Sequence, residues 1–490
     1  MNYDWKRFWC PREDHYLITD EGYLSDPKSE HARALTPNVK TLDQFSRHAC
    51  IVLLGEPGIG KSTEFNQEFE RQAHSCRETN DPCLKFNLNE YQTDTLLVSD
   101  IFDGVEQNAW KHGQGNLYLF LDSLDEGRIQ IKTIANLLSG RLLRLSSQLK
   151  RLKIRIACRT AEWPTSLAST LTELWPGDEA KFLELTPLRF VDITTAAQVQ
   201  NVDVTQFISE VSRLDAHSFA NRPISLKFLI SAFKKDGALP RSKFDLYKVG
   251  CFTLCDEFNQ SRRENPGSSQ LSSLERYTVA SRIASIVEFC GKGTISLAPQ
   301  NEQGAGEIAV ARIAGGFESI EGRQLAVTEE VVKEVLATTL FTGRGPERLA
   351  FAHKTYSEFL AAQYIVLKGI DETQIRSLIF HSSHQASIVP QLSEIGAWIS
   401  IQNPTIFEQI FVGDPQILLR SDVPTDDGLR ARLIDRLIQG FRTGELDDSN
   451  WALRAHYRKL KHAQVAEQLA PIISDPGQSL LTRRFIDTPR

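Results

Sequence analysis

The sequence predicts an α/β fold that is built on a parallel sheet in its first part and is followed by mainly helical regions. Between residues 47 and 190, short apolar runs alternate with stretches of helical periodicity, the pattern of parallel strands joined by helical crossovers. After Pro187 the strand signal fades, and a helix is predicted over residues 205–220. From residue 371 onward we find only helical segments, which proline interrupts at intervals.

Five apolar runs are the candidate strands of this sheet. They cover residues 51–54, 84–87, 117–121, 154–158 and 182–185. Helical stretches between them cover residues 61–73, 96–107 and 133–149. Parallel sheets bind their ligands at the carboxyl ends of the strands, so the residues that follow each run are the first candidates for a site.

The first run leads into the sequence Gly-Glu-Pro-Gly-Ile-Gly-Lys-Ser-Thr at residues 55–63. This stretch satisfies the P-loop pattern, and it lies between a predicted strand and a predicted helix, as the pattern requires. Its glycines allow a tight turn in which backbone N–H groups point at a phosphate, and the helix N-terminus adds positive potential. The expected nucleotide-binding residues are Gly55, Glu56, Pro57, Gly58, Ile59, Gly60, Lys61, Ser62 and Thr63.

Acidic residues follow the third run, in the sequence Leu-Phe-Leu-Asp-Ser-Leu-Asp-Glu at residues 119–126. Asp122 emerges at the same sheet edge as the P-loop, so we expect it to share Mg²⁺ with the Ser62 hydroxyl. Asp125 and Glu126 are placed to orient an attacking water. Three carboxylates this close repel one another unless a cation is present. Arg159, after the next run, could reach the terminal phosphate and complete the expected catalytic set.

The region before residue 371 mixes helices with short strands. A helix is predicted over residues 274–289, β-like pieces such as 294–297 follow, and a helix over 327–340 precedes a strand at 347–353. Thr355-x-x-Glu358 matches a capping box and predicts the start of a further helix. This succession suggests a winged-helix-like module.

The fold class is therefore an α/β P-loop nucleotide-binding domain followed by helical, winged-helix-like and all-α C-terminal regions. The C-terminal region is either the start of an α-solenoid or an irregular helical domain. We expect the aromatic leader to pack on the P-loop domain through Trp5, Phe8 and Trp9. The expected boundaries are 1–45 for the leader, 46–190 for the P-loop domain, 191–262 for the helical domain, 263–370 for the winged-helix-like domain and 371–490 for the C-terminal region.

Composition and charge argue against several classes of binding partner for this chain. Lys and Arg total 56 and Asp and Glu total 62, and the net charge of −6 gives no electrostatic case for nucleic acid or an anionic membrane. The eight cysteines form no pair or cluster with zinc spacing and fit a reducing cytosol. We find neither a signal peptide nor an apolar run approaching the roughly 18 residues of a membrane span, so a cytoplasmic location is expected.

With these motifs in place, the chain resembles the NACHT family of STAND-class signalling ATPases, which is related to animal NOD-like receptors and bacterial antiphage proteins. The resemblance covers about residues 45–370, and its most specific carrier is the acidic motif at 119–126. The sequence Ala-Cys-Arg-Thr at 157–160 resembles its sensor strand, and Phe-Leu-Glu-Leu-Thr-Pro-Leu at 182–188 resembles its last core strand. The resemblance implies that Pro223, in Asn-Arg-Pro, packs on adenine and that His353 touches the diphosphate of bound ADP.

The resemblance also implies a regulatory ATPase that works as a switch. ADP would hold a closed monomer, ATP with Mg²⁺ would replace it once a trigger is sensed, and the nucleotide domains would then self-associate. We expect slow ATP hydrolysis in bacterial antiphage signalling, with an unidentified phage or host protein as the trigger. Because only about 45 residues precede the P-loop domain, a separately encoded effector is one expectation, and a compact C-terminal sensor or a shortened chain are the others.

Two other functions fit the same motifs. An AAA+-type ATPase that remodels protein or DNA would need an arginine contributed across a subunit interface, for which Arg213 and Arg222 are the candidates. A binding scaffold with a purely structural nucleotide is the third reading, and the intact set of carboxylates argues against it.

Overall fold

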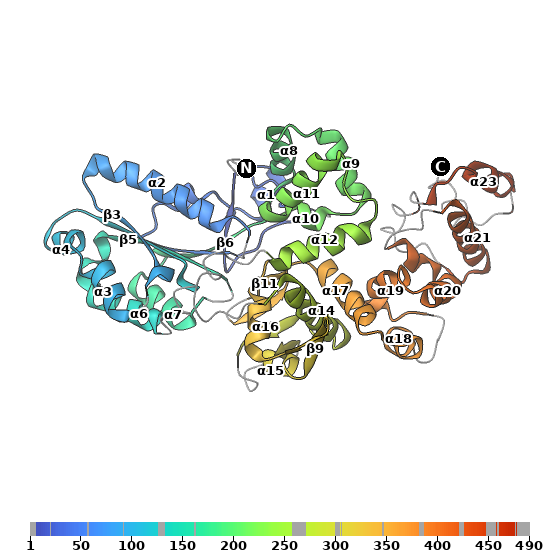
Figure 1. The fold of residues 1–490 in the computed structure, drawn as a ribbon. Coiled ribbons are helices and arrows are strands. Elements are labelled where there is room, and N and C mark those ends of the chain that lie inside the picture. Colours follow the sequence, from blue (N-terminus) through green and yellow to red (C-terminus); the bar gives the residue numbers. More distant parts are fainter. Residues whose placement is uncertain are drawn as a thin grey trace.

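Figure 1 shows an elongated molecule with an α/β unit at one end and a group of helices at the other. We call residues 6–188 the sheet domain, 190–256 the helical segment, 271–369 the mixed segment and 371–475 the C-terminal segment. The computed structural model describes residues 6–19, 21–55, 58–91, 93–125, 133–160, 163–256, 271–298, 304, 306–344, 347–381, 387–420, 426–446, 457, 460–475 and 477.

A six-stranded sheet with the order β1-β6-β2-β5-β4-β3 forms the centre of the sheet domain. Strands β2 to β6 are parallel, and β1 pairs antiparallel with β6 at one edge. The predicted parallel sheet is confirmed, and each of the five predicted apolar runs lies within one of these strands. The bounds are Trp9–Pro11 for β1, Cys50–Leu54 for β2, Cys83–Asn87 for β3, Leu117–Asp122 for β4, Leu152–Cys158 for β5 and Ala180–Leu185 for β6.

Helices cover both faces of the sheet (Figure 1). One face carries α2 (Lys61–Thr79), and the other carries α3 (Asp94–Phe102), α4 (Val105–His112), α6 (Ile134–Arg144) and α7 (Thr165–Leu174). Side chains of β2 alternate between two separate hydrophobic cores, one on each face. A strand buried on both faces reads as an uninterrupted apolar run, which is why the sequence revealed it.

Three predicted helices are divided or shortened. The helix predicted over 96–107 is wrong as one element, since α3 ends at Phe102 and α4 begins at Val105. The break is fixed by a side chain, because the Gln107 amide donates 2.7 Å to the carbonyl of Asp100. The stretch predicted over 133–149 ends as a 3₁₀ turn, Ser146–Arg151, and that over 205–220 divides into α9 (Val204–Arg213) and α10 (His217–Ala220).

The leader packs on the sheet domain, as predicted. Phe8 and Trp9 are buried, and Trp9 pairs with Leu185 across the β1–β6 ladder. The Trp9 indole also reaches Glu64 of α2, 3.5 Å away. Trp5 lies outside the described residues.

The helical segment contains α8 to α12, and the mixed segment joins four helices to short strands. Strands β11, β12, β7 and β8 form one sheet in that order, and β9 pairs with β10 as a hairpin. The bounds are α8 Phe190–Val199, α11 Pro223–Asp236, α12 Lys243–Asp256, α14 Ser273–Phe289, β7 Thr294–Ser296, β8 Glu307–Ala309, α15 Val310–Ile313, β9 Phe317–Ile320, β10 Arg323–Ala326, α16 Glu329–Leu336, β11 Phe341–Gly343, β12 Arg348–Phe351 and α17 Lys354–Leu367.

The C-terminal segment is helical in its described part, and none of the described helices is both long enough and apolar enough to cross a bilayer. A single hydrophobic core runs through the helical, mixed and C-terminal segments. Aromatic rings join the three at its centre, with Phe219 and Tyr356 4.8 Å apart and Tyr247 and Trp398 5.2 Å apart. The bounds are α18 Glu372–Ile379, α19 Ser393–Ser400, α20 Pro404–Gly413, α21 Asp427–Thr443 and α23 Val465–Ile473.

We predict that Trp9→Ala destabilises the protein by about 3–5 kcal/mol, because it empties a fully buried aromatic site. Urea unfolding followed by circular dichroism measures the loss. Phe317→Ala is the matched control, since Phe317 is 65% exposed and should cost far less. Equal losses in the two variants would contradict a structural role for β1.

Candidate functional site

The P-loop motif lies in the turn between β2 and α2, at the carboxyl edge of the sheet. Gly58 and Gly60 have φ values of +71° and +100°, the left-handed region that favours glycine. A Cβ atom on Gly58 would also lie 2.7 Å from Cγ2 of Ile224, so a side chain there would collide with α11. Lys61 is half-buried, and Ser62 and Thr63 are exposed. Glu56 and Pro57 lie outside the described residues.

Pro223 lies against the same loop, as the first residue of α11. A Cβ on Gly60 would be 3.7 Å from its Cγ. The first turn of α11 therefore covers the P-loop through Pro223 and Ile224. The structure brings the predicted proline to the P-loop, and its contact with a base stays a prediction.

Asp122 ends β4 near the predicted phosphate site and is half-buried. Burial raises the pKa of its carboxyl group, and the positive charges of Lys61 and Lys85 oppose that rise. Ser123 donates its N–H to the carboxylate at 2.8 Å from a left-handed backbone with φ +57°. Asp122 and the P-loop lysine are thus close enough to interact electrostatically.

These residues fit a magnesium ion that the phosphates of a nucleotide help to hold. Among the described residues, no group of three or more His, Cys, Asp or Glu side chains could hold a metal ion. Mg²⁺ commonly takes one or two protein oxygens and completes its shell with phosphates and water. Ser62 and Asp122 are the two protein ligands that this arrangement offers.

Asp125 and Arg159 contact each other at the ends of neighbouring strands. Arg159 Nε lies 2.9 Å from Asp125 Oδ2, and the Arg159 N–H donates to Asp125 Oδ1 at 3.2 Å. Arg159 Nη1 also donates to the carbonyl of Ala337, just after α16, at 2.9 Å. The predicted sensor arginine therefore links the sheet domain to the mixed segment in this arrangement. Its contact with a phosphate stays a prediction, and Glu126 lies outside the described residues.

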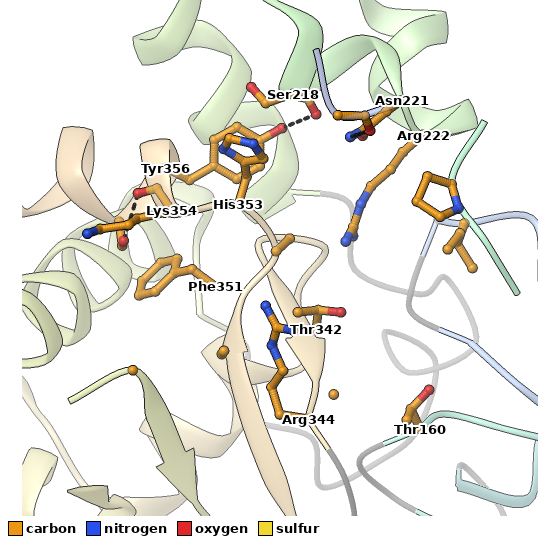
Figure 2. Close-up of a pocket in the computed structure, with 18 of the residues that line it drawn as sticks. Thr160, Ser218, Asn221, Arg222, Thr342, Arg344, Phe351, His353, Lys354 and Tyr356 are labelled. Atoms are coloured by element: carbon orange, nitrogen blue, oxygen red, sulfur yellow. Dashed lines mark hydrogen bonds between the residues drawn. The ribbon is translucent and has the colours of Figure 1, made fainter. Parts of the chain in front are cut away.

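A cavity of about 710 Å³ lies between the sheet domain and the helical and mixed segments. Its volume lies within the range of small-molecule sites, roughly 300–1,000 Å³. The P-loop contributes Gly55 and Ile59, and β5 leads into it at Thr160. Figure 2 shows the other walls, which include Ser218, Asn221, Arg222, Thr342, Arg344, Phe351, His353, Lys354 and Tyr356.

His353 lines this cavity and caps α17, which begins at Lys354. The capping box predicted at Thr355 is therefore wrong: His353 is the N-cap, and its Nδ1 accepts the N–H of Thr355 at 3.3 Å. Burial, and then the charge of Arg222, lower the pKa of His353 to about 4. The ring is neutral at pH 7 with its proton on Nε2, so it can donate to an anion in the cavity.

Sequence reasoning missed Arg7 of the leader. Its side chain is buried and donates to the carbonyl oxygens of Ile59, in the P-loop, and Thr186. Burial lowers its pKa to about 10. A single arginine among aromatic residues carries no recognisable pattern, so only the tertiary structure could assign it to the P-loop.

No protein-family model and no curated protein matches the chain. Among solved structures, it is similar to a signal transduction ATPase with numerous domains (STAND) that carries a tetratricopeptide repeat sensor, from Pyrococcus horikoshii. The identity is 11% and the TM-score 0.25, over 90% of this chain and 62% of that one, so the chain spans less than two thirds of that protein. At this TM-score the likeness carries no argument, and the site geometry stands by itself.

We predict that the stability of the protein depends on the titration of His353. The unfolded chain binds this proton near pH 6.5 and the folded protein only near pH 4, so stability falls as pH drops through that window, by about 3 kcal/mol. His353→Asn keeps a capping oxygen and removes the titration. The difference between the two unfolding free energies should therefore change between pH 7 and 4, and parallel pH profiles would contradict the buried, neutral ring.

A second prediction concerns the Asp125–Arg159 ion pair. Removing one partner leaves a buried charge, so Asp125→Ala and Arg159→Ala should each cost about 3–5 kcal/mol. The double variant should cost much less than the sum, which a double-mutant cycle measures by urea unfolding. The exposed pair Lys333–Glu329 is the control, with an expected coupling of about 0.3–0.5 kcal/mol. A coupling as small for Asp125–Arg159 would show that this pair does not join the two strand ends.

Proposed function

We propose that the protein is a nucleotide-dependent switch of the STAND class that holds ADP in the arrangement described above. The supporting observation is the cavity that the P-loop shares with the mixed segment. Gly55 and Ile59 line it from one side and His353 from the other, although these residues are far apart in the sequence. A nucleotide seated in the P-loop would therefore contact two packed bodies at once.

Each part of the site has a chemical task. The N–H groups at the start of α2 and the Lys61 ammonium bind phosphate, and the Nε2–H of His353 donates to it from the opposite wall. Mg²⁺ would neutralise part of the phosphate charge at this site. Asp122 and Ser62 hold that ion, and Pro223 covers the loop beside the nucleotide.

Slow, regulated ATP hydrolysis is the activity that this geometry supports. Arg159 is engaged by Asp125 and by the carbonyl of Ala337, which holds it on the mixed segment. An arginine held there cannot stabilise a transferring phosphoryl group until the segments separate. Opening would release Arg159 from Ala337 while its ion pair with Asp125 stays within the sheet domain, so hydrolysis and the change of shape would be coupled.

The AAA+-type alternative receives no specific support. Arg213 pairs with Glu210 at 2.8 Å and donates to the carbonyls of Pro240 and Arg241, within its own segment. Arg222 lines the cavity of its own chain.

The finer role that we propose is bacterial antiphage signalling. A phage or host protein would trigger opening, the sheet domains would self-associate, and a separate effector would be activated. This proposal is supported by the motifs at residues 119–126 and 157–160 and their resemblance to NACHT proteins.

We predict that the purified protein retains ADP, detectable by mass spectrometry, and that Lys61→Ala weakens ADP binding by at least about 100-fold, or about 2.7 kcal/mol. The lost cation interacts with the outer phosphates. Titration calorimetry compares the variant with Lys150→Ala, which removes an exposed lysine of the same domain and should bind normally. If Lys61→Ala bound ADP as the control does, the proposed function would be wrong.

A further inference from the structure

Two arginine side chains enter the cavity from different segments. Arg222 immediately precedes α11, and Arg344 immediately follows β11 in the turn toward β12. Figure 2 shows both guanidinium groups directed toward the same open space. Both act on the phenol of Tyr16 in the leader: burial raises the pKa of Tyr16, and the two positive charges lower it.

Neither guanidinium has an ion-pair or hydrogen-bond partner within the described part of the chain. Arg222 Nη1 is shielded from solvent, whereas Arg344 is exposed to it. A buried donor without an acceptor is costly, and two cations facing one space repel each other. An anion between them would satisfy Arg222 and reduce the repulsion.

Among the described residues, the two acidic side chains that line the cavity have partners of their own. Glu184 pairs with Arg12 at 3.5 Å, and Glu288 accepts a hydrogen bond from the Ser357 hydroxyl. Lys292 and Lys354 line the same cavity, Lys354 pairs with Glu358 at 3.6 Å, and His353 is neutral. An anionic ligand would therefore meet mainly positive side chains there.

We propose that Arg222 and Arg344 form a clamp for the phosphates of a nucleoside diphosphate, with Arg344 contributed only while the mixed segment is closed on the sheet domain. This proposal rests on the proposed function. It adds that the negative charge of the bound anion is required for closure. It makes Arg344 a residue that senses the nucleotide state, in addition to His353.

Charge balance makes the clamp selective. A nucleoside diphosphate carries about three negative charges, whereas a triphosphate with Mg²⁺ carries about two net negative charges. The positive side chains around the cavity therefore attract the metal-free diphosphate more strongly. The closed arrangement therefore favours metal-free ADP, and exchange for Mg²⁺–ATP weakens the attraction that holds the segments together.

The test compares Arg344→Gln with Arg344→Lys and with Arg323→Gln, an exposed arginine of the same segment. Calorimetry with ADP alone should show at least about tenfold weaker binding for Arg344→Gln, with a smaller loss for Mg²⁺–ATP. Arg344→Lys should restore most of the affinity, and Arg323→Gln should bind as the wild type does. ADP binding by Arg344→Gln equal to that of Arg323→Gln would overturn the clamp.

Charge reversal tests closure without any nucleotide. In Arg344→Glu the new carboxylate should pair with Arg222, so hydrogen exchange of residues 218–224 and 347–353 in the nucleotide-free variant should be as slow as in ADP-bound wild type. Adding Arg222→Glu places two carboxylates together and should restore fast exchange. Fast exchange in the nucleotide-free single variant would contradict the clamp. Normal ADP binding by Lys61→Ala would instead contradict the proposed function, so the two failures are distinguishable.

Discussion

The boundary between separate hydrophobic cores is the constraint on which the rest of the structure depends. The sheet domain buries most of its apolar side chains on the two faces of its own sheet, whereas the other three segments share one continuous core that Tyr23 and Leu188 of the sheet domain also join. Packed cores do not deform gradually, so the two bodies can move mainly at the surface between them. The cavity lies on that surface, and a ligand there contacts both bodies.

Polar contacts, few and specific, cross this boundary. Arg159 donates to the carbonyl of Ala337, Leu188 donates to that of Asn221, and the Tyr23 hydroxyl lies 2.7 Å from His217 Nδ1. Each hydrogen bond of this kind contributes only modestly to stability, so a ligand can shift a two-state equilibrium between the bodies. A ligand must distinguish the states by about 5.5 kcal/mol to reverse a population from 1:99 to 99:1. Charged groups around a bound polyphosphate would contribute to that difference.

Local patterns predicted the strands, the P-loop and Asp122, because each depends on a short run of residues. They failed where a side chain redirected the backbone: Gln107 helps to fix the turn between α3 and α4, and His353 caps α17 in place of Thr355. Local patterns also did not predict that Asp125 pairs with Arg159, although both residues were singled out as candidates. Strand order decides it, since β5 lies beside β4 and places the two strand ends together.

The sequence by itself determined the sheet, the P-loop turn and the acidic strand end, because hydrophobic periodicity and glycine spacing act over a few residues. Only the tertiary structure decided that Arg7 supports the P-loop, that His353 faces it across a cavity, and that Arg222 and Arg344 share that space. These residues come from distant parts of the chain. Their proximity follows from how the separate cores pack, which no local pattern encodes.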